Sequence, residues 1–389
     1  MRKLLYLLLV LPLFSFGQEK MVAGYFPYYR DINTTDWSGY TDVYFAFGFP
    51  TSDGGLEVNK SQFEAFVAKS DELGFKRYIS LGTNGFPEMA VTEEHRKNFA
   101  DTLRNFCEAY DLDGADMDWE AIDNSTDSLN FRLLMQEIRV EFDKTDLVLV
   151  ATIGDGDYWL QWYSNLALQQ ADFLQIMIYD KTGTWAASPF GNHASMQHFK
   201  WAEQYWNNRG FSDEQLVMGV PFYGYRFEST DGGLAEAVSY HDIVTHFPNI
   251  RPDDNYLFDE TGHYWFNGQD LIKEKRDYVF ENEFKGIFTW EMSQDIEGHD
   301  RSLLKPFTGE EYPEVETGIH SIQESDDWYR IKDQKLVIID EEILKVEFFD
   351  LSGKKLDLSI EDRLPLTAVL IIKAYSQVAV KSSKLVMVY

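Results

Sequence analysis

The segment Asp113-Gly114-Ala115-Asp116-Met117-Asp118-Trp119-Glu120 places acidic residues at alternate positions. Successive side chains of a β-strand point to opposite faces, so Asp116, Asp118 and Glu120 would line one face, about 6–7 Å apart. The apolar residues between them would line the other face, under a cover of helices. An ordinary protein core does not require an acidic row, so the segment predicts a functional site.

Three carboxyl groups this close cannot all ionise at low cost, so a proton is shared and the pKa of at least one rises. A carboxylic acid that stays protonated near neutral pH is what general acid catalysis needs. Glu120 has the longest side chain and lies nearest the end of the strand. We therefore predict that Glu120 is the proton donor and that Asp118 passes a hydrogen bond between Glu120 and a buried Asp116.

Two non-catalytic interpretations of the acidic row are a metal site and an inert ion-pair network. A Mg²⁺ or Ca²⁺ site would need further oxygen ligands from other strands. Only Asp180 and Asp295 offer carboxylates at comparable strand ends. We therefore predict no metal and no cofactor.

Around this segment, from about residue 20 to 308, short apolar runs alternate with amphipathic stretches. Strands are predicted over residues 21–26, 43–49, 77–82, 112–119, 147–153, 173–179, 216–223 and 286–290. Helices are predicted over residues 61–74, 92–110, 125–142, 195–209 and 269–282. This alternation predicts an α/β fold, a closed (β/α)₈ barrel with its active site at the carboxyl ends of the strands. A doubly wound open sheet is the alternative, although no glycine-rich phosphate loop follows the first strand.

The two ends of the chain differ in character from this region. Residues 1–17 have basic residues before an apolar run, which is typical of a signal peptide and predicts a secreted protein, extracellular or at the cell surface. No later segment is long and apolar enough to cross a membrane. The barrel is expected over residues 18–308, an acidic linker over 309–318, and a small antiparallel β-sandwich over 319–389.

The charge and cysteine content exclude several classes of function. The 389-residue chain has a formal net charge of −30, which would repel nucleic acid, an anionic membrane or an acidic polysaccharide. A neutral polymer is not disfavoured in this way. The single cysteine, Cys107, cannot form an intrachain disulfide and is expected to be a small buried residue.

The acidic segment resembles the motif of glycoside hydrolase family 18, the chitinases and their relatives. That motif reads Asp-Gly-x-Asp-x-Asp-Trp-Glu, and its final Glu is the catalytic acid. Further stretches resemble the family's strand motifs in the same order: Gly24-Tyr25-Phe26, Tyr44-Phe45-Ala46-Phe47, Ile79-Ser80-Leu81-Gly82, Met177-Ile178-Tyr179-Asp180, Gly219-Val220-Pro221-Phe222-Tyr223-Gly224 and Gly286–Trp290. The resemblance extends from about residue 21 to 308.

The resemblance implies hydrolysis of β-1,4 bonds between N-acetylglucosamine units, as in chitin. Most retaining glycosidases use a second carboxylate as the nucleophile, whereas in this family the substrate's own 2-acetamido oxygen attacks. Glu120 would then be the acid and base, Asp118 would orient the acetamido group, Asp116 would hold the proton balance, and Tyr179 would donate to the acetamido oxygen. The implied substrate-binding residues are Tyr25, Phe47, Trp119, Met177, Asp180, Tyr223 and Trp290.

Three departures from the family pattern leave the choice of sugar open. Ala121 and Ile122 follow the acid where Tyr-Pro is usual, Thr83 replaces the second Gly of a Gly-Gly pair, and Tyr225 takes the place of an arginine, with Arg226 one step on. An endo-β-N-acetylglucosaminidase acting on N-glycan cores and a non-catalytic chitin-binding lectin are therefore alternatives. About 60 residues separate the last two barrel strands, which leaves little room for a large insertion and favours an open groove with internal cleavage.

The C-terminal residues weakly resemble the sorting domain of the type IX secretion system of Bacteroidetes, over residues 346–354 and 384–388. This resemblance implies contact with secretion machinery. A carbohydrate-binding or spacer domain is the alternative interpretation.

Overall fold

The computed structural model describes residues 20–120, 122–156 and 160–312, and six short strands after residue 328. The chain divides into two compact units, with the boundary after Pro313. The predicted signal peptide and residues 313–318 of the predicted linker lie outside the described residues. Tyr312, near the end of the first unit, donates a hydrogen bond of 2.9 Å to Asp270.

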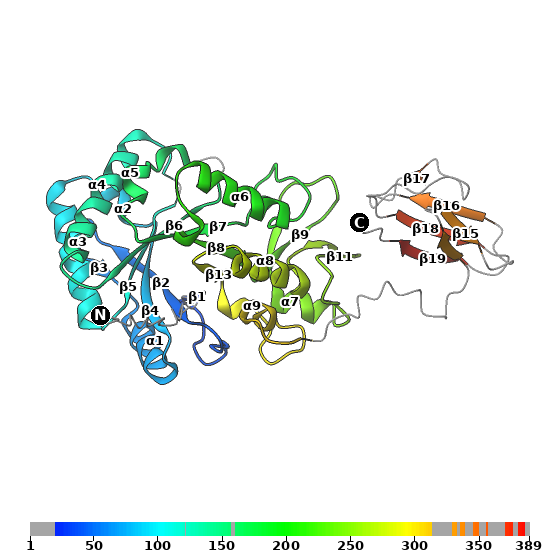
Figure 1. Ribbon diagram of the computed structural model, residues 1–389, viewed down its shortest axis with the longest axis horizontal. Coiled ribbons are helices and arrows are strands. Elements are labelled where there is room, and N and C mark those ends of the chain that lie inside the picture. The colour runs from blue at the N-terminus through cyan, green and yellow to red at the C-terminus, as the bar shows by residue number, and fades with distance from the viewer. Residues whose placement is uncertain are drawn as a thin grey trace, which may run out of the picture. The chain divides into compact units, whose positions relative to one another are not determined.

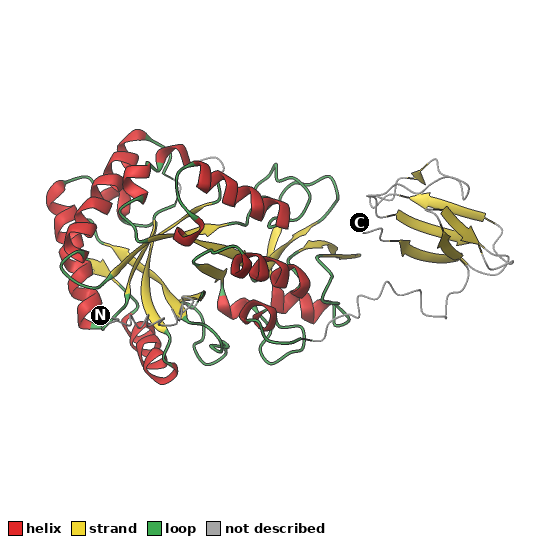
Figure 2. Ribbon diagram, viewed as in Figure 1, coloured by secondary structure: helices red, strands yellow, loops and turns green. Residues whose placement is uncertain are grey.

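A closed barrel of eight parallel strands forms the centre of the first unit (Figure 2). The strands are β1 (Met21–Pro27), β2 (Asp42–Pro50), β4 (Lys76–Gly82), β5 (Gly114–Asp118), β6 (Val148–Gly154), β7 (Phe173–Met177), β8 (Leu216–Pro221) and β13 (Gly286–Trp290). Each pairs with the next, and β1 pairs with both β2 and β13, which closes the sheet. The predicted (β/α)₈ barrel is confirmed, and the open-sheet alternative is wrong.

Helices cover the outside of the barrel strands (Figure 1). They are α1 (Lys60–Leu73), α2 (Phe86–Met89), α3 (Glu93–Ala109), α4 (Ser125–Phe142), α5 (Asn165–Leu168), α6 (Met196–Asn208), α8 (Gln269–Glu281) and α9 (Leu304–Thr308). The five long helices match the predicted ranges closely. Between β1 and β2, residues 28–41 contain no helix, so this first connection departs from strict alternation.

Helix α3 illustrates how the sequence sets these elements. The Thr92 side chain caps its first turn by accepting a hydrogen bond from the His95 N–H at 3.1 Å. One face, including Phe99, Leu103 and Cys107, is fully buried against the strands. Cys107 is therefore a buried core residue, as predicted.

An insertion fills the connection between β8 and β13. It contains β9 (Tyr223–Phe227), β10 (Glu236–Ser239), α7 (Tyr240–His246), β11 (Tyr256–Asp259) and β12 (Gly262–Trp265). The four strands form an antiparallel sheet in the order β10-β9-β12-β11. The sequence left little room for a large insertion here, and the sheet, which it did not predict, is small because its strands have only four or five residues. In Figure 1, β9 and β11 lie to one side of the barrel, near α7.

The second unit contains two antiparallel sheets. One pairs β14 (Tyr329–Lys332) with β15 (Lys335–Ile338). The other has the order β17-β16-β18-β19, from β16 (Lys345–Phe349), β17 (Lys355–Leu356), β18 (Leu370–Tyr375) and β19 (Val380–Leu385). Packing of these sheets into a sandwich stays a prediction. Among the described residues of either unit, no helix has the length and apolar character that crossing a bilayer requires.

Side chains of the barrel strands divide between two layers, inside the barrel and under the helices. On β5, Ala115 and Met117 pack in the outer layer, whereas Asp116 points inward. The interior is filled largely by aromatic rings, with Tyr44 stacked between Tyr25 at 5.1 Å and Tyr78 at 4.6 Å. The acidic row therefore rises through an aromatic barrel interior.

Gly114 provides a test of how closely β5 and β6 must approach. A Cβ at this position would lie 2.0 Å from the carbonyl oxygen of Val148, which is backbone and cannot move aside. We expect Gly114→Ala to lower the free energy of unfolding by about 1–3 kcal/mol, as overpacking does in other cores, measured by urea denaturation. Gly154→Ala is the matched control, because its Cβ would meet only Leu160 at 3.9 Å. Equal losses in the two variants would contradict the packing argument.

Candidate active site

The acidic row of β5 climbs from the barrel interior to its rim. Asp116 is fully buried, Asp118 is 4% exposed, and Glu120, two residues past the end of β5, is exposed. This gradient is the one predicted from strand alternation. It puts the longest of the three carboxyl side chains where a substrate can reach it.

Asp116 is surrounded by hydroxyl groups from neighbouring strands. Its Oδ2 accepts hydrogen bonds from Tyr25 at 2.8 Å and Ser80 at 2.7 Å, and its Oδ1 from Thr152 at 2.8 Å. Burial raises the pKa of Asp116, and the three hydroxyl groups oppose that shift. Ser80 and Thr152 were not among the predicted site residues. Ser80 lies in the Ile79–Gly82 stretch that resembles a family strand motif, whereas the signal for Thr152 is a polar side chain at an inward-facing position of β6, beside β5.

The hydroxyl neighbours of Asp116 supply one hydrogen fewer than their contacts require. Tyr25 and Thr152 lie 2.7 Å apart, so these two hydroxyl groups and the Asp116 carboxyl group form a ring of three contacts. The two hydroxyl groups supply only two hydrogens for it. A proton on Oδ1 of Asp116 would donate to Thr152, which would donate to Tyr25, and the ring would be satisfied. This geometry agrees with the raised pKa of Asp116.

Asp118 is the least satisfied member of the row. Its Oδ1 is buried and has no hydrogen-bond partner among the described residues. Burial, followed by the negative charges of Glu120 and Asp116, raises the pKa of Asp118 well above its usual range. The predicted relay of hydrogen bonds through Asp118 is not formed at Oδ1. Asp118 Oδ1 is therefore able to accept a hydrogen bond from another group or to carry a proton.

Glu120, at the rim, is the third carboxyl group of the row whose pKa is raised. The pKa of Glu120 is raised, first by loss of hydration within the site and then by the negative charge of Asp180. Its backbone N–H donates to the Thr83 hydroxyl at 2.8 Å. Ala121, the first departure from the family pattern, lies outside the described residues.

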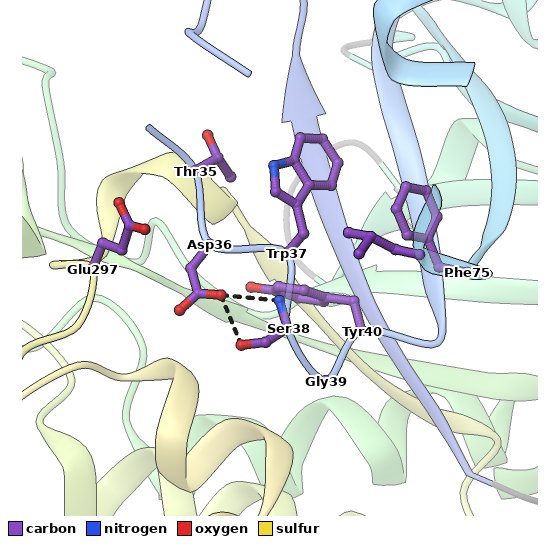
Figure 3. A pocket seen from close by; sticks show the side chains of 9 residues that line it. Thr35, Asp36, Trp37, Ser38, Gly39, Tyr40, Phe75 and Glu297 are labelled. Atoms are coloured by element: carbon purple, nitrogen blue, oxygen red, sulfur yellow. Dashed lines mark hydrogen bonds between the residues drawn. The ribbon is translucent and has the colours of Figure 1, made fainter. Parts of the chain in front are cut away.

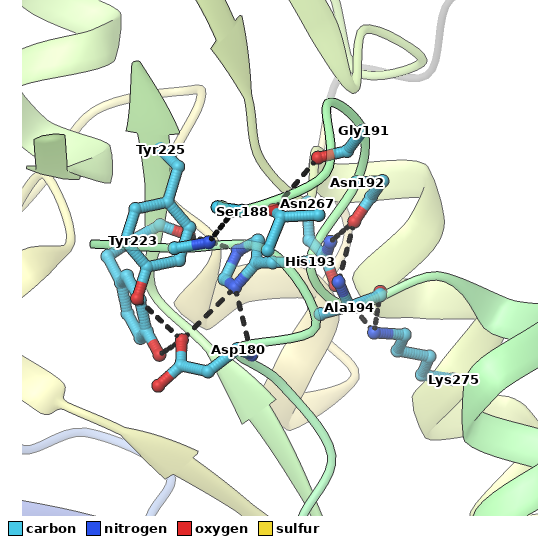
Figure 4. Close-up of polar contacts among 12 residues, drawn as sticks. Asp180, Ser188, Gly191, Asn192, His193, Ala194, Tyr223, Tyr225, Asn267 and Lys275 are labelled. Carbon is cyan, nitrogen blue, oxygen red and sulfur yellow. Dashed lines mark hydrogen bonds and ion pairs between the residues drawn. The ribbon is translucent and has the colours of Figure 1, made fainter. Parts of the chain in front are cut away.

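A second carboxylate, Asp180, follows β7 and is held in a network of polar contacts (Figure 4). Its Oδ1 accepts hydrogen bonds from Tyr223 at 2.5 Å and Tyr225 at 2.8 Å, and lies 3.5 Å from Nδ1 of His193. Burial would raise the pKa of Asp180, but His193 and the two tyrosine hydroxyl groups outweigh it and lower the pKa. Asp180 is therefore ionised across the range in which Glu120 would hold a proton.

Two of these contacts bear on the departures from the family pattern. Tyr225, which stands in place of an arginine, belongs to the Asp180 network. Arg226 does not, because its guanidinium pairs with Glu236 on the inserted sheet. His193 was missed by sequence reasoning, since nothing in its loop distinguishes it from other histidines.

Aromatic and apolar side chains surround the carboxylates. Trp290 stacks on Phe47, with ring centroids 5.7 Å apart, and lies 5.7 Å from Tyr25. Tyr179 lies 6.1 Å from Tyr223 in an edge-on contact. Met177 packs in the same interior cluster. The structure thus brings together all the predicted wall residues except one.

Trp119 is that exception. Its ring is 2% exposed and stacks on Phe86 at 5.0 Å, with Phe131 edge-on at 6.0 Å. Both partners belong to helices, so Trp119 lies in the outer layer and faces away from the carboxylates. Its prediction as a substrate-binding residue was wrong, because strand alternation places it opposite Asp118 and Glu120.

A hollow elsewhere on the first unit is unrelated to this chemistry. It lies along residues 35–40, with Leu73, Phe75 and Glu297 also lining it, and contains none of the predicted site residues (Figure 3). The carboxylate of Asp36 accepts hydrogen bonds there from the backbone N–H and the hydroxyl group of Ser38. Over the described part of the chain, no three His, Cys, Asp or Glu side chains converge as they would around a metal ion.

Comparison with known proteins gives a consistent result. Residues 21–295 match the family described as Glycosyl hydrolases family 18, which covers more than half of the chain. Chitinase 1 of Aphanocladium album is 27% identical over 205 residues, covering 46% of this chain and 48% of that protein. The class V chitinase of Lotus japonicus is 26% identical over 332 residues, covering 70% and 82%. The chain thus spans about half the length of the first relative and most of the second.

Solved structures agree with the fold. The GH18 chitinase ChiB from the chitin utilization locus of Flavobacterium johnsoniae has 25% sequence identity and a TM-score of 0.63. The match covers 75% of this chain and 93% of ChiB.

The opposite pKa shifts of Asp118 and Asp180 predict opposite effects on stability. The folded chain binds the Asp118 proton more tightly than the unfolded chain, so stability falls as pH rises above the unfolded pKa of about 4. Asp118→Asn removes that loss, and we expect its Tm at pH 7 to exceed wild type by about 2–4 °C, with the gain shrinking toward pH 4. Thermal denaturation across pH measures this.

Asp180→Asn is the contrasting variant. The lowered pKa of Asp180 contributes stability above pH 4 that is lost as pH falls. Asp180→Asn should therefore have a lower Tm at pH 7, with the deficit shrinking at acid pH. Parallel shifts in the two variants would refute the assignment of opposite environments.

Proposed function

The chain belongs to glycoside hydrolase family 18, and from that premise we propose that it is a secreted chitinase-type enzyme. Its substrate would be chitin or chitooligosaccharides, cut at β-1,4 bonds between N-acetylglucosamine units. The observation that carries the proposal is the acidic row on β5. It ends in an exposed Glu120 whose pKa is raised while the nearby Asp180 stays ionised.

In the proposed first step, Glu120 gives its proton to the glycosidic oxygen as the bond to the anomeric carbon breaks. The carbonyl oxygen of the substrate's 2-acetamido group forms the new bond to that carbon. Asp118 would accept from the acetamido N–H, and Tyr179 would donate to the acetamido oxygen. In the second step, the Glu120 carboxylate takes a proton from water, which attacks the anomeric carbon and restores the acetamido group.

The surroundings of Asp180 support a role as a fixed charge beside Glu120. Asp180 accepts hydrogen bonds from Tyr223 and Tyr225 and adjoins His193, and its pKa is lowered. These contacts suit a fixed negative charge that keeps Glu120 protonated.

The aromatic side chains and the net charge support a neutral sugar polymer. Trp290 and Phe47 present stacked rings beside the acidic row, and pyranose faces pack well on such rings. The net charge of −30 repels anionic polymers but not chitin. Internal cleavage is part of the proposal, because the inserted sheet has only short strands and the connection that carries it is short.

An endo-β-N-acetylglucosaminidase is the second candidate, because it would use the same acid and acetamido group. Tyr225 is the observation that favours this candidate. Its hydroxyl group bonds to Asp180, and it replaces an arginine that the family pattern places near the sugar. A lectin is less well supported, since Glu120 is present.

A substrate comparison with Glu120→Gln as control tests the proposal. We expect wild type to cleave chitin oligomers and to leave a high-mannose glycoprotein intact. Glutamine cannot donate the proton, so kcat should fall by at least about 100-fold, as expected when general acid catalysis is lost. Cleavage of the glycoprotein alone would favour the second candidate. If wild type and variant were equally inactive on both substrates, the proposal that the protein is an enzyme would be refuted.

The anomer released first tests the proposed steps. Two displacements at the anomeric carbon retain configuration, so NMR of early products should show the β-anomer. Early α-anomer would exclude attack by the acetamido group.

The C-terminal unit is proposed to direct secretion and to contact secretion machinery. We expect a chain ending at residue 312 to hydrolyse soluble chitin oligomers as fast as the full chain but to be retained by a Bacteroidetes host, measured by activity in culture fractions. Normal export together with lost binding to insoluble chitin would identify a carbohydrate-binding module instead.

A further inference from the structure

The backbone that carries Glu120 lies beyond the end of the barrel sheet. β5 pairs with β4 only as far as Asp118 with Gly82, and with β6 only as far as Met117 with Ala151. The peptide groups that follow have no strand partners in the barrel. Buried peptide groups of this kind need other hydrogen-bonding partners to stay in place.

On one side, the Thr83 hydroxyl group supplies such partners. It accepts a hydrogen bond from the Glu120 N–H at 2.8 Å and donates one to the Asp118 carbonyl oxygen at 3.3 Å. Thr83 directly follows β4, so its side chain continues the pairing where the β4 backbone leaves off. Glycine, the residue usual here in the family, has no side chain with which to form these bonds.

On the other side, the Tyr163 hydroxyl group forms the same kind of pair. It donates to the Trp119 carbonyl oxygen at 2.7 Å and accepts from the Ile122 N–H at 3.3 Å. Tyr163 is 4% exposed and packs edge-on against Phe131 at 5.4 Å. Its carbonyl oxygen accepts a bond of 2.5 Å from Arg209. Tyr163 is therefore held at its ring by α4 and at its backbone by Arg209, the residue that follows α6.

We propose that Thr83 and Tyr163 are positioning residues for Glu120. Each hydroxyl group uses its one hydrogen and accepts one more, so together they bond four backbone groups of residues 118–122. We call this arrangement the hydroxyl clamp. It rests on the proposed function, because its purpose is to hold the acid of that reaction.

The clamp matters because the Glu120 side chain is exposed and its position follows from its backbone. The rings of Trp119 and Phe86, stacked at 5.0 Å, anchor the segment on its outer side, and the hydrogen bonds hold its backbone on both edges. A general acid must reach the leaving oxygen within hydrogen-bond distance. Misplacement of a reacting group by about 1 Å can cost roughly 100-fold in rate.

Kinetics of hydroxyl-deletion variants test the clamp. Thr83→Val and Tyr163→Phe keep shape and remove one hydroxyl group each, and Thr83→Ser keeps the hydroxyl group. On chitin oligomers we expect kcat to fall about 10–100-fold in the two deletion variants, with KM within about twofold, and Thr83→Ser to recover most of the rate. The pH profile of kcat/KM should keep its limbs at the wild-type pH, because the clamp changes the position of Glu120 and not its charge environment.

Two variants elsewhere provide matched controls. Thr102 donates its hydroxyl hydrogen to the Gly54 carbonyl oxygen at 3.1 Å, and Tyr278 donates to Glu203 at 2.5 Å, both away from the acidic row. Thr102→Val and Tyr278→Phe lose comparable hydrogen bonds and should keep wild-type kcat. Thermal denaturation of all variants separates loss of position from loss of folding.

Hydrogen exchange tests the clamp independently of any substrate. By mass spectrometry, a peptide containing residues 118–122 should exchange about fivefold faster in Thr83→Val and Tyr163→Phe than in wild type, because each variant removes the acceptor of one backbone N–H in this segment. Exchange of the same peptide should be unchanged in the two controls. Unchanged exchange would overturn the clamp whether or not chitin is cut. If the two deletion variants exchange faster than wild type but wild type does not cut chitin, the clamp is supported and the proposed reaction is not.

The kinetic outcomes are equally decisive. If wild type is active and the deletion variants match the controls in kcat, the positioning role is excluded. A rise in KM at constant kcat, or a failure of Thr83→Ser to recover rate, would also overturn it.

Discussion

Crowding of carboxyl groups inside a closed barrel is the constraint on which the rest of the site depends. Ionised side chains are costly to bury unless they are paired or bonded. Asp116 is accommodated by hydroxyl groups of Tyr25, Ser80 and Thr152, in a ring that is complete when a proton is present. Asp118 keeps a buried oxygen without a partner. The site thus contains buried carboxyl groups whose negative charge is only partly compensated by the protein.

The pKa of the second carboxylate, Asp180, is shifted in the opposite direction. Asp180 receives hydrogen bonds from Tyr223 and Tyr225 and adjoins His193, and these contacts lower its pKa. Its charge in turn raises the pKa of Glu120. Two carboxyl groups pushed apart in pKa by their environments are a common arrangement where one must act as an acid at neutral pH. The arrangement joins the loop after β7, which carries Asp180 and His193, to β9, which follows β8, the strand paired with β7.

Errors in the predictions from sequence have identifiable causes. Trp119 lies within the motif, but strand alternation directs it to the helix layer, where it stacks on Phe86. The inserted sheet was missed because its strands of four or five residues carry little periodicity, and residues 216–223 read as one strand where β8 ends and β9 begins. The first connection lacks its helix, which a count of alternating units does not reveal.

The sequence by itself determined the barrel strands and the acidic row, because both follow from local periodicity and the alternation of side chains along one strand. Only the tertiary structure decided which groups hold the acid. Thr83 lies 37 residues from Glu120, and Tyr163 lies 44 residues from Trp119. A hydroxyl group on a loop has no distinctive pattern in the chain. Its hydrogen-bonding partners are set by where neighbouring strands end, and that is fixed when the sheet closes.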